Sequence, residues 1–184
     1  HYNINIAARV ISFMKGNELP PLPLLRSLTE LLVAMPRLAD NIDRCILSED
    51  EMSDNASSEL RNIRRSIARQ NDAIKNKLNH ILNSADNRTY LQDSIVTVRD
   101  GRYVIPVKAE HRGRFPGIIH DQSKAGATLF IEPQVIVNLN NELRELEMAE
   151  EEEIARILLE LSEAVAEHYH DIKNNQKLLL QLDF

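Results

Sequence analysis

Glycine and proline are unevenly distributed along this chain of 184 residues, and no other feature constrains its fold as strongly. Residues 100–132 contain four of the five glycines and two of the seven prolines. Because both residue types interrupt helices, the flanking segments, which are almost free of them, are expected to form long helices. Inside the interruption, residues 102–108 and 117–120 are typical of β-strands bounded by turns. The distribution therefore predicts a small β-sheet inserted between two long helices.

The first 55 residues favour three short helices. Apolar residues recur at helical spacing in three stretches, residues 4–14, 24–35 and 38–46. A stiff connector rich in proline, residues 19–23, separates the first helix from the second. We expect the three helices to pack as a compact helical base, with Ser53 or Asp54 as the N-cap of the next helix.

Residues 56–90 are expected to form an outgoing helix and residues 133–184 a returning one. The outgoing helix carries one apolar stripe in steps of three and four, interrupted at residues 70–71. Pro133 suits the first position of the returning helix, which would cover about 48 residues, on the order of 70 Å if unbroken. Residues 91–132 form a β-rich tip between the two. The predicted fold is α+β and mostly α: a helical base, two long antiparallel helices and a small antiparallel sheet at their tip.

Charge is also unevenly distributed, although the formal net charge is only −6. Residues 99–124 contain six lysines and arginines against three acidic residues, whereas residues 142–167 contain ten glutamates against two arginines. Arginine and lysine side chains on turns bind phosphate oxygens without reading sequence. The basic residues of the tip and one histidine are the candidate nucleic-acid contacts: Arg99, Arg102, Lys108, His111, Arg112, Arg114 and Lys124. The same pattern also fits a solvated surface on a purely structural arm.

The sequence contains no recognisable catalytic, nucleotide-binding or metal-binding motif. His120 and Asp121 are neighbours, but on a strand they are expected to point to opposite faces and not to form a dyad. Cys45 is the only cysteine, which excludes an internal disulfide and fits a reducing cytoplasm. No apolar run is long enough to span a bilayer, so no membrane partner is expected. Because His1 and not methionine opens the chain, we interpret it as a piece of a longer polypeptide.

Several runs of residues in and around the tip resemble the type-two branch of the MutS family. The most characteristic are DGRYVIPVK (residues 100–108), HRGR (111–114), PGIIHDQS (116–123), GATLFIEP (126–133) and LNNEL (139–143). Upstream, the resemblance continues through IDRCI (42–46) and DNASSELRNIR (54–64). It covers nearly the whole chain and is weakest before residue 36. Ser58 departs from the family pattern, in which a proline is expected.

The resemblance implies that the chain is the core, lever and reduced clamp of such a protein, a non-catalytic arm of a homodimer. ATP and magnesium would bind in an ATPase domain elsewhere, and an Smr endonuclease domain would lie further on, so no cofactor is expected here. Members of the family suppress homologous recombination through branched DNA, and in some bacteria they split collided ribosomes. Contact between the tip and the backbone of DNA, or of ribosomal RNA, is therefore implied in the cytoplasm. A purely structural lever or dimerisation arm is the third alternative.

Overall fold

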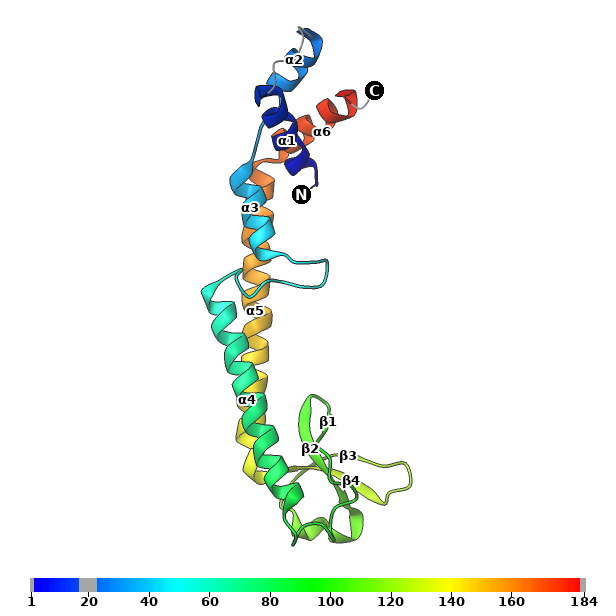
Figure 1. Cartoon of the computed structure of the whole chain (residues 1–184). Coiled ribbons are helices and arrows are strands. Elements are labelled where there is room, and N and C mark those ends of the chain that lie inside the picture. Colours follow the sequence, from blue (N-terminus) through cyan, green and yellow to red (C-terminus); the bar gives the residue numbers. More distant parts are fainter. Residues whose placement is uncertain (1, 17–22, 183–184) are drawn as a thin grey trace. The chain divides into compact units, whose positions relative to one another are not determined.

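The structure is a computed structural model that describes residues 2–16 and 23–182 (Figure 1). Its helices are α1 (Tyr2–Gly16), α2 (Pro23–Glu30), α3 (Pro36–Cys45), α4 (Ser58–Asn83), α5 (Val137–Glu167) and α6 (Tyr169–Leu182). Its strands are β1 (Thr97–Arg99), β2 (Arg102–Lys108), β3 (Gly117–Gln122) and β4 (Thr128–Pro133), with short 3-10 helices η1 (Ala109–Arg114) and η2 (Gln134–Ile136). Helices predominate and the sheet is small and antiparallel, which confirms the predicted α+β class.

The chain divides into two compact units, one of residues 62–151 and the other of residues 1–61 with 152–184. The first unit holds the sheet, most of α4 and the first half of α5. The second is helical. The connector expected at residues 19–23 lies almost entirely outside the described residues.

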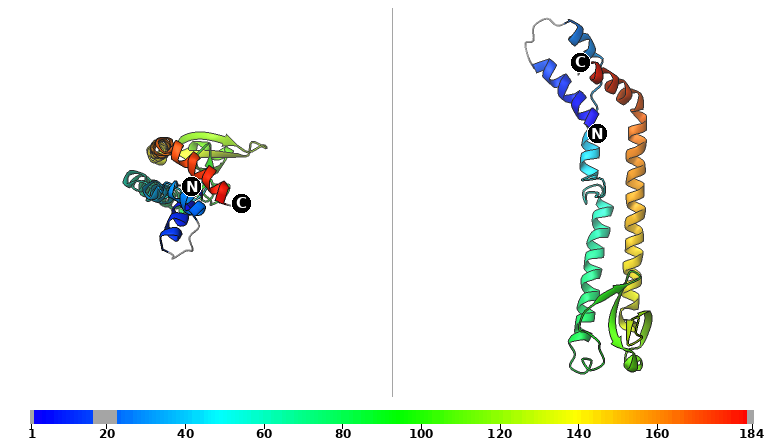
Figure 2. Two further views of the ribbon diagram at one scale, coloured as in Figure 1. Left: turned by 90° about the horizontal axis from the view of Figure 1, so that it is seen from above. Right: turned by 90° about the vertical axis from the view of Figure 1, so that its right-hand side faces the viewer.

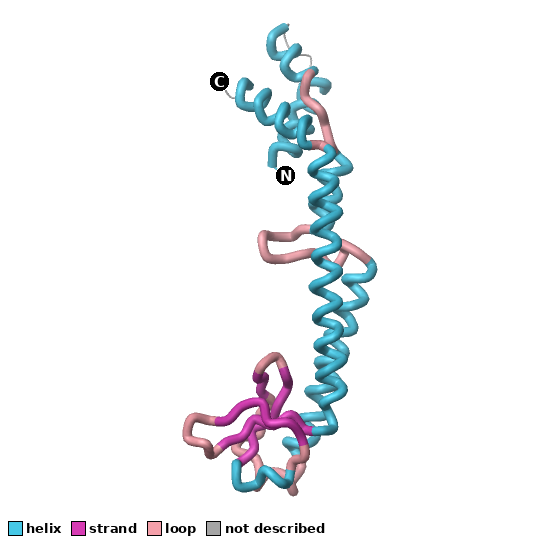
Figure 3. The backbone as a smooth tube through the Cα atoms, turned by 180° about the vertical axis from the view of Figure 1, so that it is seen from behind, coloured by secondary structure: helices cyan, strands magenta, loops and turns pink. Residues whose placement is uncertain are grey.

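The sheet has the strand order β1-β2-β4-β3, and every neighbouring pair is antiparallel. Its strands are drawn in magenta in Figure 3, where pink loops and turns connect them. β1 and β2 are joined by a two-residue turn in which Asp100 and Gly101 have positive φ angles of 51° and 73°. Asp-Gly readily adopts this conformation, and the twist of such a turn matches that of the flanking strands. β2 and β3 confirm the strands predicted at residues 102–108 and 117–120. The prediction lacks β1, which has only three residues, and β4.

The core of the sheet-containing unit lies between the sheet and two helices. The sheet contributes Ile105 and Ile131, which are almost fully buried, and α4 contributes Ile74 and Leu78, which are fully buried. Leu143 of α5 completes the cluster. Within this unit α4 and α5 lie side by side and run antiparallel (Figures 1 and 2). The burial of Ile74 and Leu78 confirms that the apolar stripe of α4 faces the core.

The returning helix begins later than predicted and is interrupted. Pro133 ends β4, where it pairs with Gly117, and α5 starts only after η2. A proline suits the end of a strand as well as the first position of a helix, and here the pairing of the strand decides. α5 and α6 are separated at His168, so the returning segment forms two helices where one was expected. The His168 N–H bonds to the carbonyl of Val165, three residues back, as in a tightened turn.

Two apolar clusters of the helical unit join segments far apart in the sequence. Cys45 of α3 and Leu60 of α4 pack against Ile157 of α5, so Cys45 lies in the core. Ala7 of α1 packs against Leu178 of α6. The first and last helices therefore contact each other.

A side chain of α6 binds the segment that follows α2. Asn175, which is 1% exposed, donates from Nδ2 to the carbonyl of Val33 at 2.7 Å, and its Oδ1 accepts the Val33 N–H at 3.0 Å. These bonds satisfy a backbone segment outside any helix. The prediction extended the second helix to about Pro36, but α2 ends at Glu30.

α4 begins with a cap that also binds a glutamate. Ser57 Oγ accepts the N–H of Leu60 at 2.9 Å and donates to Oε1 of Glu153 at 2.7 Å. Arg156 binds both oxygens of Glu153, each at 2.7 Å. The hydrogen bonds from Arg156 and Ser57 outweigh the opposing effect of burial and lower the pKa of Glu153 from 4.5 to about 2. The cap predicted at residues 53–54 is therefore wrong.

Replacing Ser57 by alanine is expected to lower the free energy of unfolding by about 1–2 kcal/mol, because an N-cap and a hydrogen bond to a buried carboxylate are both lost. Urea denaturation followed by circular dichroism measures the change. Ser58→Ala, at the exposed next position, is the matched control and should stay within about 0.5 kcal/mol of the unmodified protein. Equal destabilisation by the two variants would contradict the assignment of the cap.

Candidate nucleic-acid interface

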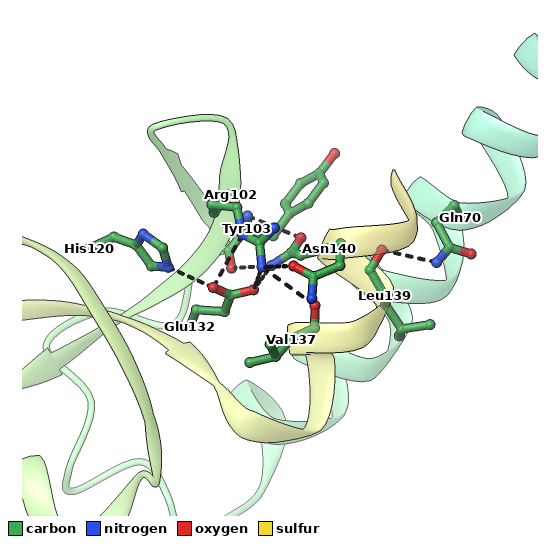
Figure 4. A network of polar contacts seen from close by, with 9 residues as sticks. Gln70, Arg102, Tyr103, His120, Glu132, Val137, Leu139 and Asn140 are labelled. Atoms are coloured by element: carbon green, nitrogen blue, oxygen red, sulfur yellow. Dashed lines mark hydrogen bonds and ion pairs between the residues drawn. The ribbon is translucent and has the colours of Figure 1, made fainter. Parts of the chain in front are cut away.

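A fully buried carboxylate, that of Glu132 in β4, lies at the centre of a polar cluster at one end of the sheet (Figure 4). Arg102 of β2 binds both of its oxygens, with Nη2–Oε1 at 2.6 Å and Nε–Oε2 at 3.2 Å. His120 Nε2 of β3 lies 2.6 Å from Oε2, and Asn140 Nδ2 of α5 donates to Oε1 at 2.7 Å. The cluster therefore joins three strands to the first turn of α5.

The groups around Glu132 keep its carboxylate charged. Burial by itself raises the pKa of Glu132, because it disfavours the charged form. Hydrogen bonds from Arg102, Asn140 and His120, together with the positive charge of Arg102, act in the opposite direction and outweigh burial. The pKa of Glu132 is lowered from 4.5 as a result, and the carboxylate is ionised at neutral pH. An ionised carboxylate has enough lone pairs to bind all three neighbours at once.

Asn140 also completes the sheet where Pro133 cannot. The register that pairs Ile105 with Ile131 places Tyr103 opposite Pro133, which has no N–H to donate. Asn140 Nδ2 donates to the Tyr103 carbonyl at 3.2 Å, and Asn140 Oδ1 accepts the Tyr103 N–H at 3.4 Å. A side-chain amide from α5 therefore replaces the missing backbone partner.

Two polar residues interrupt the apolar stripe of α4, and both bind other parts of the unit. Gln70 Nε2 donates to the carbonyl of Leu139 at 3.0 Å (Figure 4). It also donates to Glu142 Oε2 at 2.8 Å. The Tyr103 hydroxyl donates to Asn71 Oδ1 at 2.6 Å. Specific polar contacts of this kind fix the register between packed elements, which a uniform apolar stripe leaves open.

Two of the six arginines and lysines predicted as contacts are bound by acidic side chains of the protein. Arg102 belongs to the Glu132 cluster and is only 17% exposed. Arg99 Nε lies 3.0 Å from Asp121 Oδ2, and its guanidinium lies 4.1 Å from the centre of the Phe130 ring. Sequence alone did not reveal these partners, because each lies more than twenty positions away along the chain.

Arg112, Arg114 and Lys124 form an exposed basic surface, a name used below for these three residues. All three are exposed, and within the described part of the chain none forms an ion pair with a carboxylate. Arg112 and Arg114 lie in η1, and Lys124 lies in the turn between β3 and β4. The N–H of Ala109 at the start of η1 bonds to the carbonyl of Ala127 in that turn at 2.9 Å, which ties the two segments together.

The remaining two predicted residues lie near a tyrosine that the sequence reasoning missed. The Tyr90 ring is 5.0 Å from the His111 ring, edge to face, and 5.3 Å from the guanidinium of Arg114. Lys108 Nζ donates to the carbonyl of Thr89, next to Tyr90, at 3.0 Å. Tyr90 lies in an irregular segment, where no periodicity could have indicated its role.

His120 and Asp121 differ from expectation in one respect. A β-bulge lies between Ile119 and Asp121. Glu132, which binds His120, and Phe130, which lies opposite Asp121 in the register, are two apart on β4 and so lie on one face of the sheet. The expectation of opposite faces is therefore wrong. Each side chain nevertheless has a separate partner: His120 binds Glu132, and Asp121 binds Arg99.

In the ranges that the structure describes, no group of three or more histidines, cysteines or acidic residues is placed to hold a metal ion. None of the helices described is both long and apolar enough to cross a membrane.

Comparison with known proteins decides the family. The chain is 52% identical over 179 residues to Endonuclease MutS2 of Alkaliphilus oremlandii (strain OhILAs), a match that covers 97% of this chain and 23% of that protein. It is 52% identical over 162 residues to Endonuclease MutS2 of Clostridioides difficile (strain 630), covering 88% of this chain and 20% of that protein. The chain belongs to the MutS2 family.

The MutS2 match is confined to part of each relative. Endonuclease MutS2 of Pelotomaculum thermopropionicum (strain DSM 13744 / JCM 10971 / SI) is 51% identical over 162 residues, which cover 88% of this chain and 21% of that protein. The chain thus spans about a fifth of the length of the MutS2 proteins that it matches. No family model matches the chain.

Proposed function

We propose that this MutS2 segment is a non-catalytic arm that contacts the backbone of a nucleic acid through the exposed basic surface, Arg112, Arg114 and Lys124. The observation that carries the proposal is that these three cations are exposed and unpaired with carboxylates in the described residues, whereas Arg99 and Arg102 are neutralised internally. Exposed guanidinium and ammonium groups on turns bind phosphate oxygens well. The Glu132 cluster would hold the strands that carry these turns.

Contact would be made with the backbone and not with base edges. In the described residues of η1 and the β3–β4 turn, the exposed groups are charged side chains on short turns, and no long helix presents them to a groove. Backbone contacts position a protein on a nucleic acid without selecting its sequence. The arm would therefore recognise the shape and charge of its target.

Branched or duplex DNA is the target we favour, because the relatives are named endonucleases. In the intact MutS2 homodimer, this contact would serve the suppression of recombination in the cytoplasm. Nuclease and ATPase activities, with ATP and magnesium, would reside in parts of the polypeptide outside this chain. Ribosomal RNA on a collided ribosome is the second candidate, because it offers the same phosphate chemistry to the same cations.

Reversing two charges in the full-length protein tests the proposal. The double variant Arg112→Glu, Arg114→Glu is expected to bind branched DNA on the order of tenfold to a hundredfold more weakly, since two charge-assisted contacts become repulsive. The slope of log affinity against log salt concentration should also become less negative by about 2. Fluorescence anisotropy with labelled DNA measures both quantities, and sedimentation with ribosomes measures the alternative.

The matched control is Arg65→Glu, Arg69→Glu, which makes the same charge change on exposed positions of α4 in the same unit. This control should keep an affinity close to that of the unmodified protein. Loss of ribosome binding with unchanged DNA binding would identify ribosomal RNA as the target. Unchanged affinity for both targets would contradict the contact and leave the arm as a structural lever.

A further inference from the structure

The part of α5 that lies in the helical unit has two separate apolar faces. The first is buried against α3 and α4 and includes Ile157 and Leu161, which are 3% and 6% exposed. The second apolar face lies about a third of a turn away around the helix axis, at roughly 100° per residue. It consists of six residues, Ala155, Leu158, Leu159, Ser162, Val165 and Ala166, all of them at least partly exposed and none of them charged.

The exposure of the large side chains on the second apolar face is substantial. Leu158 is 43% exposed, Leu159 is 60% exposed and Val165 is 37% exposed. Single exposed apolar residues are common on protein surfaces, but here they follow one another along three turns. A solvated helix usually places its charges over the whole surface outside the core stripe. This arrangement of exposed apolar residues is therefore typical of a helix face that packs against a partner.

The charged residues of this part of α5 are segregated on a third arc of the helix. Glu152, Glu160, Glu163 and Glu167 lie on this acidic arc, beside the second apolar face. Arg156 is the arc's one basic residue, and it is already bound to Glu153 and Glu160. The arc therefore carries an excess of negative charge that is unpaired within α5.

The second apolar face has the shape that a helix can pack against. Ala155, Ser162 and Ala166 are small, so they leave spaces between the larger side chains of Leu158, Leu159 and Val165. An alternation of small and large residues at steps of three and four accepts the side chains of a second helix as knobs into holes.

We infer that a further helix of the same polypeptide, outside these 184 residues, packs on the second apolar face and carries lysines or arginines along its flank beside the acidic arc. Charge complementarity favours a basic flank, because the excess glutamates would be stabilised by it. A second copy of α5 would bring the same glutamates and no free arginine. About four-fifths of each matched MutS2 protein lies outside the segment that corresponds to this chain, so the polypeptide has ample sequence for such a helix.

Cysteine labelling in the full-length protein tests whether this face is covered. Leu159→Cys, on the second apolar face, is expected to react with a maleimide at least about tenfold more slowly than Glu163→Cys, on the acidic arc. Mass spectrometry of the peptide that contains each new cysteine gives the rate without interference from Cys45. Val165→Cys provides a second reading of the same face, and circular dichroism establishes that each variant is folded. Equal labelling rates at positions 159 and 163 would overturn the inference.

A photo-cross-linking amino acid at position 159 identifies the occupant. The expected product has the mass of one subunit and joins position 159 to a peptide of the same polypeptide that contains lysine or arginine. A product with the mass of two subunits would show that a second copy covers the face, and a linked peptide without basic residues would contradict the charge argument. Either of these results overturns the inference as stated. The labelling and the cross-linking experiments do not depend on nucleic-acid binding, so they are separate from the test of the exposed basic surface.

Discussion

Replacing Glu132 by alanine is expected to lower the free energy of unfolding by about 3–5 kcal/mol, the cost typical of removing one partner from a buried ion pair. The substitution leaves the guanidinium of Arg102, which is only 17% exposed, without its carboxylate. It also removes a hydrogen-bond partner from His120 and from Asn140. Urea denaturation followed by circular dichroism measures the change.

Glu110→Ala is the matched control for the loss of a carboxylate. The Glu110 side chain is 74% exposed, and its one ion pair among the residues that the structure describes is with His111 at 3.3 Å. This variant should remain within about 0.5 kcal/mol of the unmodified protein. A loss below about 1 kcal/mol for Glu132→Ala would contradict the central place given to the cluster.

The Glu132 variant should also change how stability depends on pH. The pKa of Glu132 in the folded protein is below its ordinary value of 4.5, so the unfolded chain binds this proton first as the pH falls. The stabilisation is therefore complete above about pH 4.5 and is lost as the pH falls through the folded pKa. Glu132→Ala should lose stability less steeply than the unmodified protein below pH 4.5. Parallel curves for the two proteins would contradict the lowered pKa.

Gly117→Ala is expected to cost about 3 kcal/mol, because no side chain fits at this point of the sheet. A Cβ atom on Gly117 would lie 2.1 Å from the carbonyl oxygen of Glu132 and 3.0 Å from the Cα of Pro133. Both are backbone atoms, so a change of rotamer cannot relieve the overlap, and β3 must move away from β4. The same denaturation experiment measures this loss.

Gly113→Ala is the control for the change from glycine to alanine. A Cβ atom on Gly113 would meet no heavy atom within 4 Å, and the φ angle of Gly113 is not in the left-handed region. Its substitution should be neutral or stabilise by up to about 1 kcal/mol, because alanine restricts the unfolded chain. If both glycine variants were equally destabilised, the close approach of β3 to β4 would be refuted.

The parts of the fold that depend on local pattern were predictable from the sequence. β2 occupies residues 102–108 as predicted, and the apolar stripe of α4 faces the core. The parts that depend on distant partners were not predictable. Pro133 satisfies the local requirements of a helix start and of a strand end, and its pairing with Gly117 selects the strand. The break at His168 could not be predicted, because no glycine or proline lies near it in the sequence.

At the candidate site too, the composition could be read from the sequence, whereas the partners of each charged side chain could not. The excess of positive charge in residues 99–124 was visible in the sequence, but the charges that remain free were not. Arg102 was grouped with Arg112 because both are basic residues of the tip. Only the fold brings Glu132, thirty positions away, against Arg102 and leaves Arg112 exposed. Nothing in the sequence around Glu132 predicted that its carboxylate is buried.

Site-specific photo-cross-linking tests whether the exposed basic surface contacts nucleic acid. A photo-reactive amino acid is placed at position 112 of the full-length protein, or at position 145, where the exposed Glu145 of α5 lies in the same unit. Each protein is bound to labelled branched DNA or to ribosomes and irradiated, and the cross-linked nucleic acid is quantified. We expect cross-links to nucleic acid from position 112 and few from position 145. Equal yields from the two positions, or none from position 112 in a complex that is demonstrably bound, would contradict this expectation.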